Sequence, residues 1–290
     1  MKHHHDTKFS RIFQSHTKFS SVVVVLVGLL LILPALGLEF LWGEDRRQVL
    51  YRVNSQIDIQ DNIEEWQYLA KRGDVRAKIE LCQYHFSNKF YKQALRSCKK
   101  AARFRDSSAQ YTLGTMYLNG YGVTVNANKA IKWFKKSANR GNTETQIRLA
   151  RMYSKGENVQ LSHKKAAKWY KRAAKQNNAT AQNNLAIQYL KGQGIRKNTQ
   201  KARTLLEQAA SNGDSLAQYN LSIFYFNGQN GKQNNTEAYK WLFISRKTGP
   251  VYNIDKRNEL YNQLQQSLTL TEREDAQMQA KLWMRSRGYQ

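Results

Sequence analysis

The two cysteines of this chain, Cys82 and Cys98, are its best candidates for covalent chemistry. If this part of the chain lies outside the cytoplasm, an even number of cysteines favours a disulfide. His85 stands one helical turn beyond Cys82, so these side chains could also approach a metal ion, but a structural metal site needs a fourth ligand and none is evident nearby. We therefore expect a Cys82–Cys98 disulfide, ahead of two buried free thiols and of a metal site.

Catalytic groups find little support elsewhere in the sequence. After the N-terminal region the chain has only two histidines, His85 and His163, and His163 stands beside lysines in an expected loop. No Ser-His-Asp or Cys-His arrangement shows local spacing, and there is no phosphate-binding glycine loop or metalloprotease pair. Glycines such as Gly192 and Gly194 are interpreted as turns of a repeat. We expect a protein that is not an enzyme and holds no cofactor or metal.

Basic side chains outnumber acidic ones, with 47 Lys and Arg against 21 Asp and Glu and a formal net charge of +26. Net charge bears on partners and solubility rather than on fold. Many lysines recur at the same position of successive repeats, on the outer side of expected helices, and they include a basic stripe of Lys132, Lys135, Lys168 and Lys171. A run of like charge usually marks a solvated face. The alternative is a surface for anionic lipid or glycan.

An internal repeat supplies the elements that must position these side chains. The phrase LGTMYLNGYGV, which begins at Leu113, returns three times in similar form at steps of 36 residues. The columns that keep this step include a tyrosine (Tyr117, Tyr153, Tyr189, Tyr225), a glycine (Gly120, Gly156, Gly192, Gly228), an alanine (Ala130, Ala166, Ala202, Ala238) and a tryptophan or leucine (Trp133, Trp169, Leu205, Trp241). A period of this length indicates a solenoid of stacked repeats.

Each repeat is predicted to form two helices joined by a turn. The first, as in Ala109–Asn119, has an apolar stripe at helical spacing, and Gly120 supplies a left-handed stop after it. The second covers Asn128–Asn139. One such hairpin cannot bury its apolar side alone, so several must stack. We predict an all-α fold: a right-handed α/α solenoid of about five 36-residue helix-turn-helix repeats over residues 63–250, with capping helices over 251–290 and one transmembrane helix before it.

These columns resemble a known family. The pattern AQ-x-x-L-x-x-x-Y-x-x-G-x-G, followed by A-x-x-W-[FY]-x-[KR]-[SA]-A-x-x-G, is similar to the Sel-one-like repeat, a relative of the tetratricopeptide repeat. The resemblance covers Trp66 to Gly249 and includes a divergent first unit in which His85 replaces the tyrosine. The segment SLTLTEREDAQMQAKLW resembles the closing helix of the family, and Thr271-x-x-Glu274 is predicted to be the capping box that opens it. Some secreted members carry a cysteine pair linking the helices of one unit, which Cys82 and Cys98 resemble.

The resemblance also implies where a partner would bind. In related solenoids the first helices line the concave face, and in this chain the residues of that face vary from repeat to repeat while the core columns do not. Such a face usually binds an extended segment of another protein. A plain solvated groove is the alternative. The candidate partner-binding residues are Tyr111, Arg148, Arg151, Asn184, Tyr219 and Asn220.

The N-terminal region decides the expected compartment. Residues 1–20 form a basic tail, and residues 21–42 form an apolar segment, in which Val22 to Trp42 as a helix would be about 31 Å long, enough to cross a bilayer. The basic excess lies before this segment and should stay in the cytoplasm. A cleaved signal peptide is the rival interpretation, with a possible cleavage site at Ala35-x-Gly37. We expect a single-pass inner-membrane protein with a tether over 43–62 and a periplasmic solenoid, which makes nucleic acid an unexpected partner.

These expectations together describe a membrane-tethered scaffold or adaptor that binds another protein. A binder of anionic envelope glycan or lipid through the basic stripe is the alternative from a different class.

The compartment can be tested directly. A reporter enzyme that is active only outside the cytoplasm, fused after Gln290, should be active, because the basic tail holds the N-terminus inside. A reporter active only in the cytoplasm, fused at the same position, should be silent. The reverse pattern would contradict the expected topology.

Overall fold

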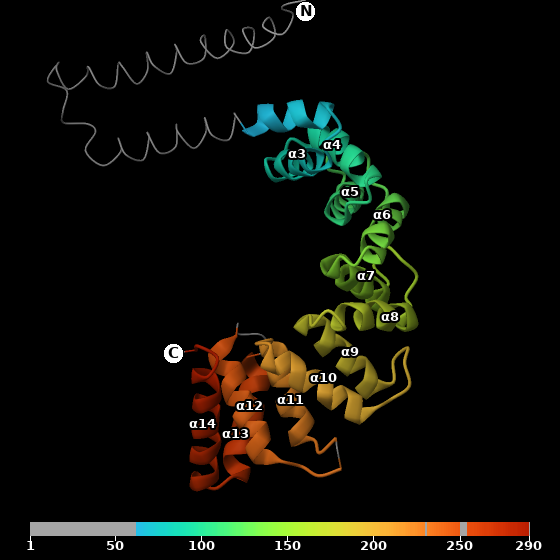
Figure 1. Cartoon of the computed structure of the whole chain (residues 1–290). Helices are drawn as coiled ribbons and strands as arrows, with labels where there is room; N and C mark the ends of the chain where they lie inside the picture. Colours follow the sequence, from blue (N-terminus) through green and yellow to red (C-terminus); the bar gives the residue numbers. More distant parts are fainter. Residues whose placement is uncertain (1–61, 230, 250–253, 290) are drawn as a thin grey trace, which may run out of the picture. The chain divides into compact units, whose positions relative to one another are not determined.

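The computed structural model describes residues 62–229, 231–249 and 254–289, and these residues contain helices and turns but no β-strand (Figure 1). Residues 66–290 form the second of the chain's two units. The expected basic tail, the membrane segment of residues 21–42 and the tether up to residue 61 lie outside the described residues. Within the described part, no helix is both long and apolar enough to cross a membrane.

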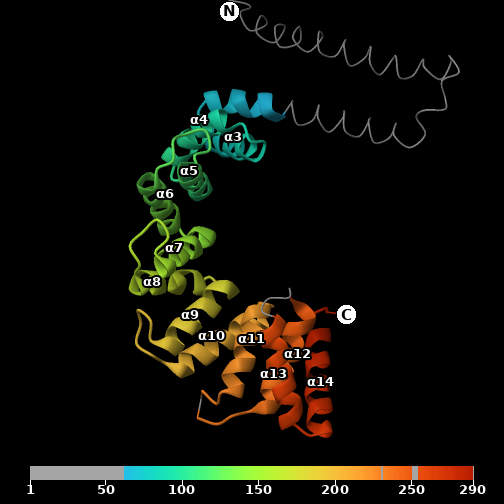
Figure 2. The same cartoon turned by 180° about the vertical axis from the view of Figure 1, so that it is seen from behind.

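The second unit is a succession of helix pairs, in which each helix packs against the helices before and after it (Figures 1 and 2). The first helices of the pairs are α3 (Val75–Ser87), α5 (Ser107–Asn119), α7 (Thr143–Lys155), α9 (Ala179–Lys191) and α11 (Ser215–Phe226). The second helices are α4 (Tyr91–Arg103), α6 (Ala127–Asn139), α8 (His163–Ala174), α10 (Thr199–Ser211) and α12 (Asn235–Thr248). Two further helices, α13 (Ile254–Ser267) and α14 (Leu270–Arg285), both pack against α12. Five pairs within the described residues agree with the expected solenoid.

Helix boundaries follow from side chains that cap them. An aspartate or asparagine precedes each first helix and accepts the backbone N–H three residues later, as Asn142 does from Thr145 at 2.8 Å. Such a cap contributes on the order of 1 kcal/mol. At the other end, Gly120, Gly156 and Gly192 adopt the expected left-handed conformation with φ of 75°, 76° and 66°. His163 does not lie in a loop, because Ser162 caps α8 and His163 is its first residue.

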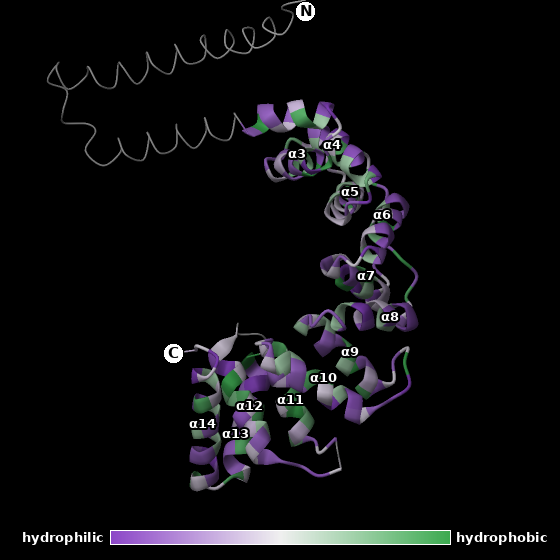
Figure 3. Cartoon of the chain, in the orientation of Figure 1, coloured by the Kyte–Doolittle hydropathy of each residue, from purple (hydrophilic) through white to green (hydrophobic). Residues whose placement is uncertain are grey.

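The core runs between the helices of each pair and between neighbouring pairs. Figure 3 shows hydrophobic and hydrophilic residues interleaved along the helices, as expected when each helix buries one stripe. The repeated alanines at 130, 166, 202 and 238 are all fully buried, which lets helices approach closely. Gly114 is packed so tightly that an added Cβ would lie 2.5 Å from the ring of Phe134. Small residues at helix crossings and large aromatics beside them therefore fill the core.

In a column of four buried glutamines, three join their helix pair to the pair before it, and Gln182 donates to Gln208 of its own pair. The first helices carry Gln110, Gln146, Gln182 and Gln218, none of them more than 4% exposed. Gln146 Nε2 donates to the carbonyl of Ala138 at 2.9 Å, and Gln218 Nε2 donates to the carbonyl of Ala210 at 3.2 Å. The acceptors lie at the C-terminal ends of α6 and α10, where the last carbonyls of a helix have no partner within it. The glutamines thus give these carbonyls a second donor, besides the N–H groups of Gly141 and Gly213 in the turns that follow.

The divergent first pair has its own core around the cysteines. Cys82 and Cys98 are bonded to each other, lie on α3 and α4, and are fully buried. They belong to a small apolar cluster that is separate from the main core and extends to Leu113 and Met116 of α5. His85 Nδ1 lies 3.2 Å from the hydroxyl of Ser97, and burial lowers the pKa of His85. His85 of α3 is therefore hydrogen-bonded to α4 within this helix pair.

The cap of the last helix corrects one expectation. The capping box does not form between Thr271 and Glu274; it forms between Thr269 and Glu272, and α14 begins at Leu270. The Thr269 hydroxyl accepts the Glu272 N–H at 3.3 Å, and the Glu272 carboxylate accepts the Thr269 N–H at 2.9 Å. Both threonines stand three residues before a glutamate. Thr269 is the N-cap of α14, so Thr271 lies in the first turn of the helix.

The buried glutamine column predicts a stability loss. Gln218 is fully buried, and its Oε1 also accepts from the Thr248 hydroxyl at 2.7 Å. Gln218→Leu removes two buried hydrogen bonds, although this hydroxyl keeps the Ile244 carbonyl and the Ala210 carbonyl keeps the Gly213 N–H. At about 0.5–1.5 kcal/mol for each lost bond, we expect the free energy of unfolding to fall by about 1–3 kcal/mol in urea denaturation. Gln83→Leu, at an exposed position of α3, is the control and should change it by less than about 0.5 kcal/mol. Equal effects of both substitutions would contradict this role.

The disulfide predicts a second loss. The bond links residues 16 apart in the pair that lacks a full neighbour on its N-terminal side, and Cys98→Ser should lower stability by about 2–4 kcal/mol. Mass spectrometry without reductant should show one linked peptide containing both cysteines. Two free thiols in protein from its native compartment, or reductant without effect on the melting curve of the wild type, would refute the prediction.

Candidate protein-binding groove

The first helices of successive pairs form one continuous surface, here called the first-helix face. α3 contacts α5, and α9 contacts α11, in addition to the contacts within pairs. Polar side chains also join neighbouring first helices: Tyr111 of α5 donates to Glu144 Oε1 of α7 at 2.7 Å, and Asn220 of α11 donates to Asn183 Oδ1 of α9 at 2.7 Å. Because the helices that form this face are tied to each other, the side chains on it are held in a defined order.

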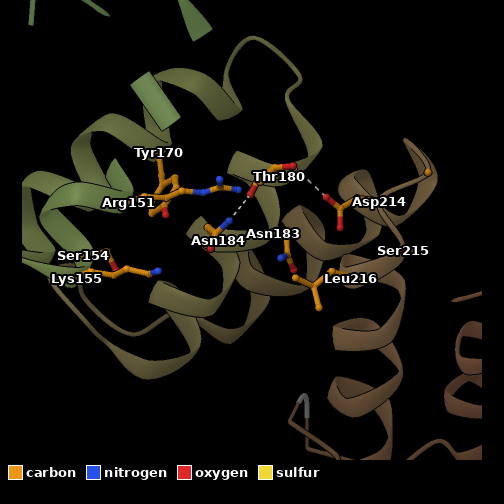
Figure 4. A pocket seen from close by; sticks show the side chains of 11 residues that line it. Arg151, Ser154, Lys155, Tyr170, Thr180, Asn183, Asn184, Asp214, Ser215 and Leu216 are labelled. Atoms are coloured by element: carbon orange, nitrogen blue, oxygen red, sulfur yellow. Dashed lines mark hydrogen bonds between the residues drawn. The ribbon is translucent and has the colours of Figure 1, made fainter. Parts of the chain in front are cut away.

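Two hollows on this face lie next to each other and share Arg151 and Thr180. The larger has a volume of about 770 Å³ and the smaller about 460 Å³. The larger is lined by Arg151, Ser154, Lys155, Tyr170, Thr180, Asn183, Asn184, Gly213, Asp214, Ser215 and Leu216 (Figure 4). The smaller is lined by Tyr111, Leu118, Glu144, Ile147, Arg148, Arg151, Met152, Glu157, Asn158 and Thr180. We call the two together the first-helix groove.

The smaller hollow contains a tyrosine held between an acid and a base. Arg148 Nη1 donates to the Tyr111 hydroxyl at 3.2 Å, and this hydroxyl in turn donates to Glu144. The Arg148 guanidinium also lies 5.0 Å from the ring centroid of Phe134, in cation–π range. Burial and the hydrogen bond to Glu144 raise the pKa of Tyr111, which keeps its hydroxyl protonated at neutral pH. The arginine is therefore positioned by contacts of its own rather than left mobile.

The larger hollow presents hydrogen-bonding groups from three first helices. Figure 4 shows Arg151 and Lys155 reaching over it from α7, opposite Asp214 at the start of α11. Asn184 Nδ2 donates to the Thr180 carbonyl at 2.7 Å, and the Thr180 hydroxyl donates to Asp214 Oδ2 at 3.3 Å. Burial raises the pKa of Tyr170, while the hydrogen-bonded Arg151 opposes that rise. The hollow is thus lined by cationic, amide and hydroxyl groups.

Four of the six predicted partner-binding residues meet in this groove, and two lie outside it. Tyr111, Arg148, Arg151 and Asn184 line the hollows. Tyr219 is only 6% exposed, because Arg257 of α13 lies over its ring at 5.3 Å from the centroid. Asn220 forms a hydrogen bond with the buried Asn183. The residue pattern of one repeat could not reveal that a capping helix would cover this part of the face.

Several groove residues were missed by the sequence analysis. Tyr170 comes from the second helix α8, and Ser154 and Lys155 lie at the C-terminal end of α7. Asp214 is the N-cap of α11, accepting the Ala217 N–H through Oδ1 at 2.8 Å, so its second oxygen faces Thr180. Variation along the predicted columns could have pointed to Ser154 and Lys155, but only the packing of α8 places Tyr170 beside them.

The predicted basic stripe lies on the second helices. Lys132 and Lys135 belong to α6, Lys168 and Lys171 belong to α8, and all four are exposed. Among the ion pairs of the described residues, none involves these four lysines. The helices α4, α6 and α8 contain no aspartate or glutamate at all. No group of three or more metal-ligating side chains occurs in the part of the chain that the structure describes.

Comparisons with known proteins agree with the repeat geometry. The Sel1 repeat family model matches residues 107–142, 143–178, 179–214 and 215–244. A Sel1 repeat protein from Oxalobacter formigenes is 26% identical with a TM-score of 0.54, covering 68% of this chain and 87% of its own. A protective antigen of uropathogenic Escherichia coli strains, which displays an SLR fold, is 25% identical with a TM-score of 0.51 and covers 77% of this chain. This chain spans 56% of the length of that antigen.

No curated protein sequence matches the chain significantly. The helix pairs of residues 107–244, with their 36-residue period, are similar to Sel1 repeats.

Proposed function

We propose that this chain is a membrane-tethered, extracytoplasmic adaptor that holds an extended segment of another protein in the first-helix groove. The single observation that carries the proposal is the groove itself: two adjoining hollows that follow α5, α7, α9 and the start of α11. A segment crossing several repeats needs such a continuous track, whereas a small ligand would need one enclosed site.

The chemistry of the groove suits a peptide backbone. Arg148, Arg151 and Lys155 offer N–H groups to backbone carbonyls or carboxylates of the segment. Asn184 uses its Nδ2 within α9, so its Oδ1 remains as an acceptor for a backbone N–H. Glu144, Glu157 and Asp214 stand among these cations, so the groove is not uniformly positive. Recognition by mixed donors and acceptors favours a polar, extended segment over a strongly charged polymer.

The membrane tether and the compartment are inferred from the sequence. The apolar run of residues 21–42 follows a basic tail and is long enough to cross a bilayer, which supports a position of the repeats outside the cytoplasm. The disulfide in the first helix pair is consistent with this placement, because such bonds persist in oxidising compartments. An adaptor fixed at the membrane surface would bring its partner to that surface.

A second candidate function rests on the basic stripe. Lys132, Lys135, Lys168 and Lys171 are exposed, and their helices contain no acidic residue that would neutralise them. The second-helix side could therefore bind anionic envelope glycan or lipid. Binding of this kind would weaken steeply with salt, because exposed charges are screened over about 8 Å at physiological ionic strength.

Site-specific crosslinking tests the groove first. A photoreactive amino acid at Ser154, which lies in the groove, should crosslink one defined partner, while the same amino acid at the exposed Lys164 of α8 serves as the control. The partner identified in this way is then purified for binding measurements. A product that forms equally from both positions would argue against a groove-bound segment.

Binding of that partner separates the two functions. Arg148→Ala combined with Asn184→Ala should weaken affinity about tenfold or more, because a charged and a neutral hydrogen bond are lost, with only mild dependence on salt. The control replaces Lys132, Lys135 and Lys168 by Gln and should leave affinity nearly unchanged. Thermal melts confirm that both variants are folded. Affinity lost only in the lysine variant and at high salt would favour the anionic-surface function.

A further inference from the structure

A third hollow lies on the side of the second helices, between α8 and α10. Its volume is about 500 Å³, within the range of about 300–1,000 Å³ that is usual for ligand pockets. It is lined by Lys171, Ala174, Lys175, Asn177, Leu185, Tyr189, Gln200, Lys201, Thr204, Leu205 and Gln208. We call it the α8–α10 pocket. It shares no residue with the first-helix groove.

The pocket occurs at the repeat that lacks its tryptophan. The same position of the other repeats holds Trp133, Trp169 and Trp241, and this repeat holds Leu205. Trp169 and Trp241 are each only 8% exposed and belong to the main core, so their indoles fill the space between neighbouring pairs. The smaller Leu205 is partly buried at the edge of the core and lines the hollow. The pocket is thus the space that an indole occupies in the sister repeats.

A second replacement keeps the pocket uncovered. In the two preceding repeats a basic side chain lies over the indole: Lys136 Nζ is 4.3 Å from the Trp133 ring centroid, and the Arg172 guanidinium is 4.7 Å from that of Trp169. The equivalent residue of α10 is Gln208, which carries no charge and accepts a hydrogen bond from Gln182 of α9 at 3.5 Å. Neither an indole nor a cation of the chain therefore closes the pocket.

The walls of the pocket define the ligand that it suits. Ala174, Leu185 and Leu205 supply an apolar floor, and the Tyr189 ring lies 6.0 Å from Lys201 Nζ. Lys171 of α8 and Lys175, the C-cap of α8, are exposed at the rim, as is Lys201 of α10. None of the residues that line the pocket is acidic. An apolar floor inside a ring of lysines is complementary to a large apolar group that carries negative charges beside it.

We propose that the α8–α10 pocket docks a tryptophan side chain from an acidic segment of a partner protein. The indole takes the place that Trp169 takes in the preceding repeat, and carboxylates beside it approach Lys171, Lys175 and Lys201. Buried aromatic anchors in pockets with a charged rim carry most of the affinity in protein interfaces. This site is independent of the segment in the first-helix groove and adds a second point of attachment on the opposite helices.

Fluorescence anisotropy with a labelled peptide tests the pocket. The probe has one tryptophan flanked on both sides by glutamates and aspartates, and its matched control has alanine in place of tryptophan. The full chain in mild detergent should bind the tryptophan peptide about tenfold or more tightly than the alanine peptide. Leu205→Trp should remove this difference, because the chain's own indole then fills the pocket as in the sister repeats, and the variant should melt no lower than the wild type.

A second pair of variants separates the pocket from general charge attraction. Lys171→Gln with Lys201→Gln should weaken binding of the tryptophan peptide severalfold, while Lys135→Gln with Lys165→Gln, the same positions of the preceding repeat, should not. These lysines are exposed, so this pair also carries the test if Leu205→Trp melts early.

Three results would overturn the proposal. One is equal affinity for the tryptophan and alanine peptides. Another is equal loss of peptide binding in both lysine pairs. The third is a result with phosphatidylglycerol vesicles in place of the peptide. If the peptide does not bind, and the vesicles bind the wild type and Leu205→Trp equally but bind both lysine double variants weakly, the surface binds lipid instead.

Discussion

A two-helix hairpin cannot bury its apolar stripe by itself, and every other feature of this array follows from that constraint. Each pair must lie against the next, so the residues between pairs are held to narrow choices. The alanine column is fully buried, and the glutamine column satisfies helix carbonyls that stacking removes from water. Each of these hydrogen bonds contributes about 0.5–1.5 kcal/mol, so the glutamines add to the apolar packing between pairs. The disulfide and the capping helices serve the two ends, where a neighbour is missing.

Stacking does not restrict every position of a repeat, and the unrestricted positions can differ from one repeat to the next. On the first-helix face, neighbouring helices are joined by polar side chains that differ from repeat to repeat, such as Tyr111 with Glu144 and Asn220 with Asn183. These differences create hollows in one part of the face and close another, where Arg257 covers Tyr219. On the second-helix side, one column departs from its rule at Leu205, and a pocket appears there. Departures from a strict repeat are therefore where binding chemistry is concentrated.

Charge is distributed unevenly in relation to these faces. The helices α4, α6 and α8 carry lysines and arginines with no acid, while the groove mixes Arg148 and Arg151 with Glu144, Glu157 and Asp214. Like charges in successive helices repel each other, and water and salt screen most of that repulsion because the side chains are exposed. In the proposed functions, the basic second-helix side raises the rate at which acidic partners meet the molecule, and the mixed groove selects among them.

The sequence by itself determined the helix pairs, their 36-residue period and their caps, because these depend on residues close together in the chain, such as Gly120 after α5. It also predicted that Tyr111, Arg148, Arg151 and Asn184 lie on the first-helix face. Helical periodicity shows which positions face away from the core once the core columns are known. Only the tertiary structure decided that Tyr219 is covered, that Tyr170 enters the groove from α8, and that Leu205 leaves a hollow. These outcomes depend on which side chain of a neighbouring pair fills a given space, and local pattern carries no information about that. The capping box also lies two residues before the predicted position. Thr269 and Thr271 each precede a glutamate by three residues, so the sequence pattern could not distinguish them, and Thr269 is the N-cap in the structure.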